Sequence, residues 1–224
     1  MARAVGSVVS VQVGNVAPLG RDGVPSGFVK RPIAGPVMAD RLGLSGDAQA
    51  DKSVHGGPDK AVYCYPFEHY ARWREVIPQH AALLAPGGFG ENLTVVGLDE
   101  DEAAIGDVYR IGDATVQVTQ PRQPCFKLAL RFDDPRMVRA MVQSGLCGWY
   151  LRVRSPGLLT ADSVVTLIER PNPSWTVARF HRFSTGGRPS LAEVTEVAAL
   201  SGLARHWRRA AQEALGTVPT ESAD

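Results

Sequence analysis

The segment I-G-D-V-Y-R-I-G-D-A-T-V-Q-V-T at residues 105–119 contains two short runs rich in β-branched and aromatic residues, joined by Gly112-Asp113. A Gly-Asp pair between two such runs is typical of a tight β-hairpin, because glycine accepts the turn conformation without steric cost. In the second run, Val116 and Val118 alternate with polar residues, which is the pattern of a strand with one apolar face. The stretch therefore predicts an antiparallel hairpin that contributes one face to a core.

Further strand patterns lie on both sides of this hairpin, and turn residues separate them. The chain has 23 glycines and 16 prolines, a content that suits many short strands. We therefore predict a mainly β fold, built as a closed or semi-closed barrel rather than an open doubly wound sheet. Two helices, at about 67–76 and 135–143, are expected to interrupt the strands. The predicted strands outside the hairpin cover residues 8–13, 28–33, 37–40, 60–65, 149–153 and 164–169.

The composition changes at P-N-P, residues 171–173, a stiff break after which strand patterns stop. Three helical patterns follow, and Ser190 with Glu193 forms a capping box at the start of the second. We therefore predict a β-barrel domain at residues 1–170 and a small three-helix domain at 171–224. We expect this tail to pack as its own bundle and to border the functional site. The predicted helices cover 175–183, 191–199 and 203–215, the last with an apolar stripe of Leu203, Trp207, Ala211 and Leu215.

The charge and cysteine content excludes several classes of function. With 24 basic and 23 acidic residues the formal net charge is +1, so no global field favours nucleic acid or an anionic membrane surface. No stretch approaches the roughly 18 apolar residues of a membrane span. The three cysteines are too few and too irregularly spaced for a disulfide framework, a zinc ribbon or an iron–sulfur cluster. We therefore expect a cytoplasmic protein without nucleic-acid or membrane partners.

The segment T-Q-P-R-Q-P-C-F-K-L at 119–128 places Cys125 between Arg122 and Lys127. Neighbouring cations favour the thiolate, which attacks electrophiles or ligates soft metals. An inert, buried cysteine is the alternative, and it is the interpretation that we prefer for Cys64 and Cys147.

The segment D-A-Q-A-D-K-S-V-H-G-G-P-D-K at 47–60 has paired glycines, Gly56 and Gly57, directly after His55. Backbone N–H groups of such a turn can cradle an anion, and Lys52 and Lys60 would add positive charge. A tight turn with a surface histidine fits the same residues.

Two further segments carry polar residues at the ends of strand patterns. G-G-F-G-E-N-L at 87–93 is expected to present Asn92 as an amide donor and acceptor, unless it is an ordinary glycine-rich connection. S-G-F-V-K-R-P-I at 26–33 carries adjacent cations, of which only Lys30 or Arg31 can enter a site, because neighbours on a strand point to opposite faces. The acidic run at 99–102 is expected to be a solvated loop.

Together these four segments resemble the MOSC domain, and within it the YiiM-like branch, over about residues 6 to 170. The resemblance implies a β-barrel that binds the molybdenum cofactor, a phosphorylated pterin dithiolene, with Cys125 as the metal ligand. It also implies that His55 lies in the site, where it would act as a proton donor. The predicted cofactor-binding residues are Lys30, Lys52, Asn92, Arg122, Gly56 and Gly57.

The implied reaction is reductive cleavage of the N–O bond of N-hydroxylated compounds, such as 6-N-hydroxylaminopurine, to amines, a detoxification that does not require pyridoxal phosphate. A separate electron-donor reductase would be needed, because the sequence has no flavin or nicotinamide fingerprint. The family also implies a homodimer. Two alternatives stay open: a non-catalytic cofactor or sulfur carrier with a persulfide on Cys125, and a cysteine hydrolase pairing Cys125 with His55, which no motif supports.

Overall fold

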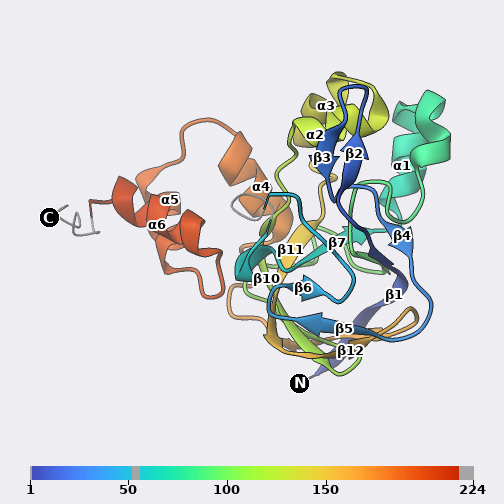
Figure 1. Cartoon of the computed structure of the whole chain (residues 1–224). Helices are drawn as coiled ribbons and strands as arrows, with labels where there is room; N and C mark the ends of the chain where they lie inside the picture. The colour runs from blue at the N-terminus through green and yellow to red at the C-terminus, as the bar shows by residue number, and fades with distance from the viewer. Residues whose placement is uncertain (1, 52–55, 217–224) are drawn as a thin grey trace, which may run out of the picture.

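The computed structural model describes residues 2–51 and 56–216, and it confirms a mainly β fold with helices (Figure 1). Seven strands close into a barrel, because the first strand also pairs with the last. All neighbours in the barrel are antiparallel except β7 and β8, which are parallel. The order around the barrel is β13 (Val164–Glu169), β9 (Val108–Ile111), β10 (Ala114–Pro121), β11 (Trp149–Ser155), β7 (Val62–Pro66), β8 (Leu93–Val96) and β1 (Arg3–Val13).

Smaller elements lie outside the barrel wall. Strands β12 (Gly157–Leu159), β5 (Val37–Asp40) and β6 (Gly43–Leu44) form a second sheet, β2 (Ala17–Leu19) pairs with β3 (Val24–Ser26), and β4 (Arg31–Pro32) adds to β1. In Figure 1 the β2–β3 hairpin lies at the same end of the molecule as α1, α2 and α3, whereas α5 and α6 stand at one side of the barrel. The helices are η1 (Pro58–Lys60), α1 (His69–Val76), η2 (Pro78–Leu83), α2 (Phe126–Phe132), α3 (Arg136–Ser144), α4 (Val177–Thr185), α5 (Leu191–Ala199) and α6 (Arg205–Ala214).

The hairpin predicted at 105–119 is present as β9 and β10. Ala114 pairs with Ile111 across a turn in which Gly112 has a φ of 57°, a conformation that favours glycine. Val116 and Val118 point into the barrel core, as their alternation indicates. Gln117 and Thr119 on the polar face of β10 are also buried, and the backbone N–H of Ala204 in the tail donates to the carbonyl of Thr119 at 3.1 Å. The tail therefore packs directly on this strand.

Two local predictions were wrong. The strand expected at 28–33 reduces to Arg31–Pro32, and residues 28–30 are not paired in a sheet. Helix α2 was not predicted, because the prolines before Cys125 indicate a loop and the helix has only seven residues. A weak signal was present: Leu128 and Phe132, four positions apart, are both buried.

Two hydrophobic cores lie on opposite sides of the barrel wall. Val62 and Cys64 of β7 point into the barrel, whereas Tyr63 and Tyr65 belong to an outer core with α1, α2 and α3. The inner core continues into the tail, where Trp175, Phe180, Leu203 and Ala211 join the same cluster as the barrel residues. The tail helices therefore pack on the barrel as well as on one another, and the domain boundary at residue 170 stays a prediction.

The tail itself forms much as its sequence predicts. Helix α5 covers Leu191–Ala199, the expected range, and the capping box between Ser190 and Glu193 is present. Leu203 and Ala211 of the expected stripe are buried, and Trp207 packs against the core. No helix in the described part of the chain is long and apolar enough to cross a membrane.

Candidate functional site

A cavity on the outer face of the barrel brings together four of the residues predicted for the site: Lys30, Asn92, Arg122 and Cys125. Its walls come from residues 26–30 and 47–50, from the outer faces of β7 and β11, from the glycine-rich loop before β8 and from the loop that precedes α2. The space amounts to about 650 Å³ when the solvent-filled mouth is included, so the cavity is open on one side.

Arg122 is the most unusual side chain of this cavity, since it is only 4% exposed. One guanidinium nitrogen donates to the sulfur of Met141 at 2.9 Å, and the group lies 5.7 Å and 5.6 Å from the ring centroids of Phe28 and Tyr63. Within residues 2–51 and 56–216, no carboxylate forms an ion pair with it. Burial lowers the pKa of Arg122, but the adjacent tyrosines and thiols outweigh this effect and raise it. A buried cation without a carboxylate is costly, so this one is suited to an anionic ligand.

Lys30 and Asn92 are instead held by Asp47, whose side chain is almost fully buried. The ammonium of Lys30 forms an ion pair with Asp47, and the Asn92 amide nitrogen donates to the same carboxylate at 3.0 Å. Burial lowers the pKa of Lys30, and Asp47 opposes that shift. Asn92 also accepts a hydrogen bond from the backbone N–H of Tyr63 at 3.1 Å. Both residues therefore hold the cavity wall together, and Asp47 was missed because no motif singles it out.

The glycine-rich loop at 87–93 folds around a buried carboxylate that sequence analysis did not identify. Glu91 accepts hydrogen bonds from the backbone N–H groups of Gly87 at 2.7 Å and Phe89 at 3.1 Å, and from the hydroxyls of Tyr70 and Thr94. Burial raises the pKa of Glu91. These contacts fix the backbone of the loop next to Asn92, and a direct contact of the Asn92 amide with a ligand stays a prediction.

Cys125 differs from the other two cysteines in its surroundings. It is half-buried, lines the cavity and is the N-cap residue of α2, with an extended backbone. Cys64 and Cys147 are buried, and burial raises the pKa of each thiol well above its ordinary value. In the described part of the chain, no group of three His, Cys, Asp or Glu side chains could hold a metal ion. A metal at Cys125 would therefore have to bring most of its ligands with it.

Lys60, which the sequence indicates as a cation beside the paired glycines, lines the cavity. Its ammonium lies 5.9 Å from the ring centroid of Tyr150, and burial lowers its pKa while Asp59 and Cys125 raise it. Gly57 has a φ of 89° and precedes η1, but neither it nor Gly56 is among the described residues that line the cavity. Lys52 and His55 lie outside the described residues.

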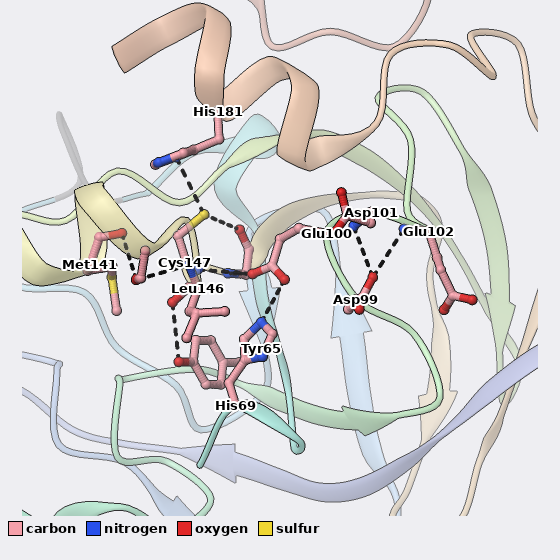
Figure 2. A network of polar contacts seen from close by, with 12 residues as sticks. Tyr65, His69, Asp99, Glu100, Asp101, Glu102, Met141, Leu146, Cys147 and His181 are labelled. Carbon is pink, nitrogen blue, oxygen red and sulfur yellow. Dashed lines mark hydrogen bonds and ion pairs between the residues drawn. The ribbon is translucent and has the colours of Figure 1, made fainter. Parts of the chain in front are cut away.

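A network of polar contacts around Glu100 fixes the turn at 144–148 (Figure 2). Glu100 contacts the ring nitrogen of His69 at 2.6 Å and accepts hydrogen bonds from the backbone N–H groups of Cys147 at 2.9 Å and Gly148 at 2.6 Å. The carbonyl of Gly148 in turn accepts from the backbone N–H of Arg122 at 3.0 Å. The expectation that residues 99–102 form a solvated loop is therefore wrong for Glu100, which is 5% exposed.

Comparison with known proteins agrees with this architecture. The family model for the MOSC domain matches residues 51–166. The protein YflK of Bacillus subtilis strain 168 is 40% identical over 204 residues, which cover 90% of this chain and 91% of that protein. The protein YiiM of Escherichia coli strain K12 is 44% identical over 149 residues, 66% of either chain.

A third relative and one solved structure extend the comparison. A protein named reductase from Gibberella moniliformis is 36% identical over 178 residues, which cover 78% of this chain but 32% of that longer protein. The crystal structure of YiiM from Geobacillus stearothermophilus has a TM-score of 0.79 and 33% identity, and the match covers 94% of this chain and 99% of that one. The likeness therefore includes the tail as well as the barrel.

Proposed function

This chain belongs to the MOSC domain family, in its YiiM-like branch, and we propose that it is an oxidoreductase that binds a molybdenum cofactor in the Cys125 cavity and reduces N-hydroxylated compounds to amines. The observation that carries the proposal is the buried guanidinium of Arg122, which has no carboxylate partner among the described residues and lines the same cavity as a half-buried thiol. One side chain suits an anionic group, and the other suits a soft metal.

The residues of the cavity fit such a cofactor. Arg122 and Lys60 would bind its phosphate, because both carry positive charge into a partly desolvated space. Cys125 would be the protein's thiolate ligand, and the dithiolene of the pterin would supply further ligands that the described side chains do not provide. Lys30 and Asn92 would shape the cavity wall rather than bind the phosphate, because Asp47 already binds both side chains.

The reaction consumes two electrons and two protons, and converts the hydroxylamine to an amine and water. When bound, the cofactor supplies the two electrons and accepts the oxygen. The aromatic rings of Phe28, Tyr63 and Tyr150 would exclude water from the cavity that they line. His55 is the predicted proton donor, as its ordinary pKa lies near neutrality. The name of the relative from Gibberella moniliformis supports reductase chemistry. The separate electron donor, the homodimer and the cytoplasmic location stay predictions.

A single-turnover experiment tests the proposal. Protein from a host that makes the cofactor is reduced with dithionite, mixed with a hydroxylaminopurine, and the amine is quantified. Cys125→Ser should abolish amine formation, whereas Cys64→Ser and Cys147→Ser should retain most of it, because neither thiol lines the cavity.

Undiminished reduction by the Cys125→Ser variant would refute the assigned role of this thiol. If loaded parent protein forms no amine but carries a persulfide on Cys125, the sulfur-carrier alternative is correct instead.

A further inference from the structure

The last helix of the tail is capped by a residue of the barrel rather than by its own sequence. Helix α6 begins at Arg205, and its N-cap residue, Ala204, has no side chain that can accept a hydrogen bond. The backbone N–H of Arg205 instead donates to Asp59 at 2.8 Å, across 146 positions of sequence. The first N–H groups of a helix have no hydrogen-bond partner within the helix. Asp59 therefore caps the N-terminus of α6, which the side chain of Ala204 cannot do.

Asp59 is held from the barrel side as well. Its other carboxylate oxygen accepts from two nitrogens of Arg152 on β11, at 3.0 Å and 2.6 Å. The Asp59 carbonyl accepts from the hydroxyl of Thr119 at 2.6 Å. Burial raises the pKa of Asp59, but the contacts with Arg205 and Arg152 prevail and lower it, so the carboxylate stays ionised. The residue is thus fixed by β10, β11 and α6 together.

The next residue along the chain is Lys60, which lines the cavity with Cys125 and Arg122. His206 on α6 also lies close enough to Lys60 for their charges to interact: burial lowers the pKa of His206, and the charge of Lys60 lowers it further. A shift of Asp59 would therefore change where the Lys60 ammonium sits relative to the cavity.

We propose that Asp59 is a positioning residue through which the helical tail holds Lys60 in the cavity that binds the anionic group. The inference rests on the proposed function, because it assumes an anion in that cavity. In this arrangement the tail is connected to the site through the carboxylate of Asp59, and it does not merely cover the surface of the barrel.

Position 205 offers a matched pair of variants. Arg205→Pro removes the N–H that Asp59 accepts, yet proline is well tolerated at the first position of a helix. The preceding residue, Ala204, has a ψ of 138°, which is compatible with a following proline. Arg205→Ala removes the same side chain but keeps the N–H. The difference between the two variants isolates the hydrogen bond to Asp59.

The readout is protection of Cys125 by pyrophosphate against iodoacetamide, followed by mass spectrometry of full-length protein prepared without cofactor. Arg205→Ala should need nearly the same pyrophosphate concentration as the parent, because the ion pair that its exposed side chain forms with Asp59 at 3.6 Å contributes little. Arg205→Pro should need about three- to tenfold more, as expected for the net loss of one hydrogen bond of ordinary strength. Lys60→Gln should show a similar loss, and the double variant Arg205→Pro/Lys60→Gln no further loss, because the two changes act on one contact.

Glu169→Ala is the control, since it breaks an exposed ion pair with Arg154 in a surface groove that Asp59 and Arg205 also line, away from the cavity. If Arg205→Pro does not fold, Asp59→Asn should reproduce the loss. If pyrophosphate protects the proline and alanine variants equally, or if the losses multiply in the double variant, the role of Asp59 is refuted but the anion-binding cavity is not. Absence of protection in the parent protein would overturn the anion-binding cavity itself.

Discussion

Replacing Arg122 by methionine should separate stability from ligand binding, with effects of opposite sign. Burying a guanidinium costs several kcal/mol. Two ring contacts, at about 0.5–2 kcal/mol each, return only part of that cost. Methionine has a similar length and an unbranched, adaptable side chain, so it should fill the space. We expect the free energy of unfolding to rise by about 0–2 kcal/mol.

Binding of the anionic group should weaken at the same time. The lost charge-assisted contact corresponds to about 1.5–3 kcal/mol, which is about ten- to a hundredfold in affinity. Urea unfolding measures the first effect, and the pterin-to-protein ratio after gel filtration measures the second. Arg152→Met is the matched control, because Arg152 has a carboxylate partner in Asp59 and its loss should destabilise the protein by about 1–3 kcal/mol. If Arg122→Met is destabilised like Arg152→Met and keeps its pterin, Arg122 is a structural residue and our reasoning about it is wrong.

Three further predictions concern the scaffold around the site. Glu100→Ala should lower the free energy of unfolding by about 3–5 kcal/mol in urea titrations, because it leaves His69 and two backbone N–H groups without a buried partner. A loss below about 1 kcal/mol would contradict a stabilising role for the Glu100 contacts. Folding lowers the pKa of Asp59, so its contacts stabilise the protein above a pH of about 4, and this stability is lost as the pH falls through the folded-state pKa. The variant Asp59→Asn should therefore show a flatter dependence of the free energy of unfolding on pH in that acid range. An unchanged pH dependence would contradict the lowered pKa. Truncation after Pro173 should expose the part of the shared core formed by Trp175, Phe180 and Leu203, and yield dye-binding or aggregated protein rather than a cooperatively unfolding barrel.

Local patterns predicted the elements whose formation depends on neighbouring residues. The hairpin around Gly112 and the helix that Ser190 caps each carry their signal within a few positions, and both form as predicted. Helix α2 did not, because the prolines before Cys125 mask a short helix whose stability comes from packing of Leu128 and Phe132.

The site was predictable in part, where its residues lie close together in the sequence. Arg122 and Cys125 share one segment, and the motif spacing places them in one site. Asp47, Glu91 and Glu100 were missed as organisers, because each acts through contacts with residues distant in sequence. A carboxylate in a loop has the same local sequence signature whether it is solvated or holds buried N–H groups.

The closure of the barrel between β1 and β13 has a consequence for synthesis in the cell. Arg3 pairs with Leu167, so the first strand lacks this neighbour until most of the chain has left the ribosome. At roughly 5–20 residues per second, that interval lasts roughly 10 to 30 seconds. Throughout it, one edge of β1 is open to pairing with other nascent chains, and the long sequence separation makes closure a slow step. We therefore expect production of this protein to depend on chaperones that bind extended segments, and its yield to fall when translation outpaces them.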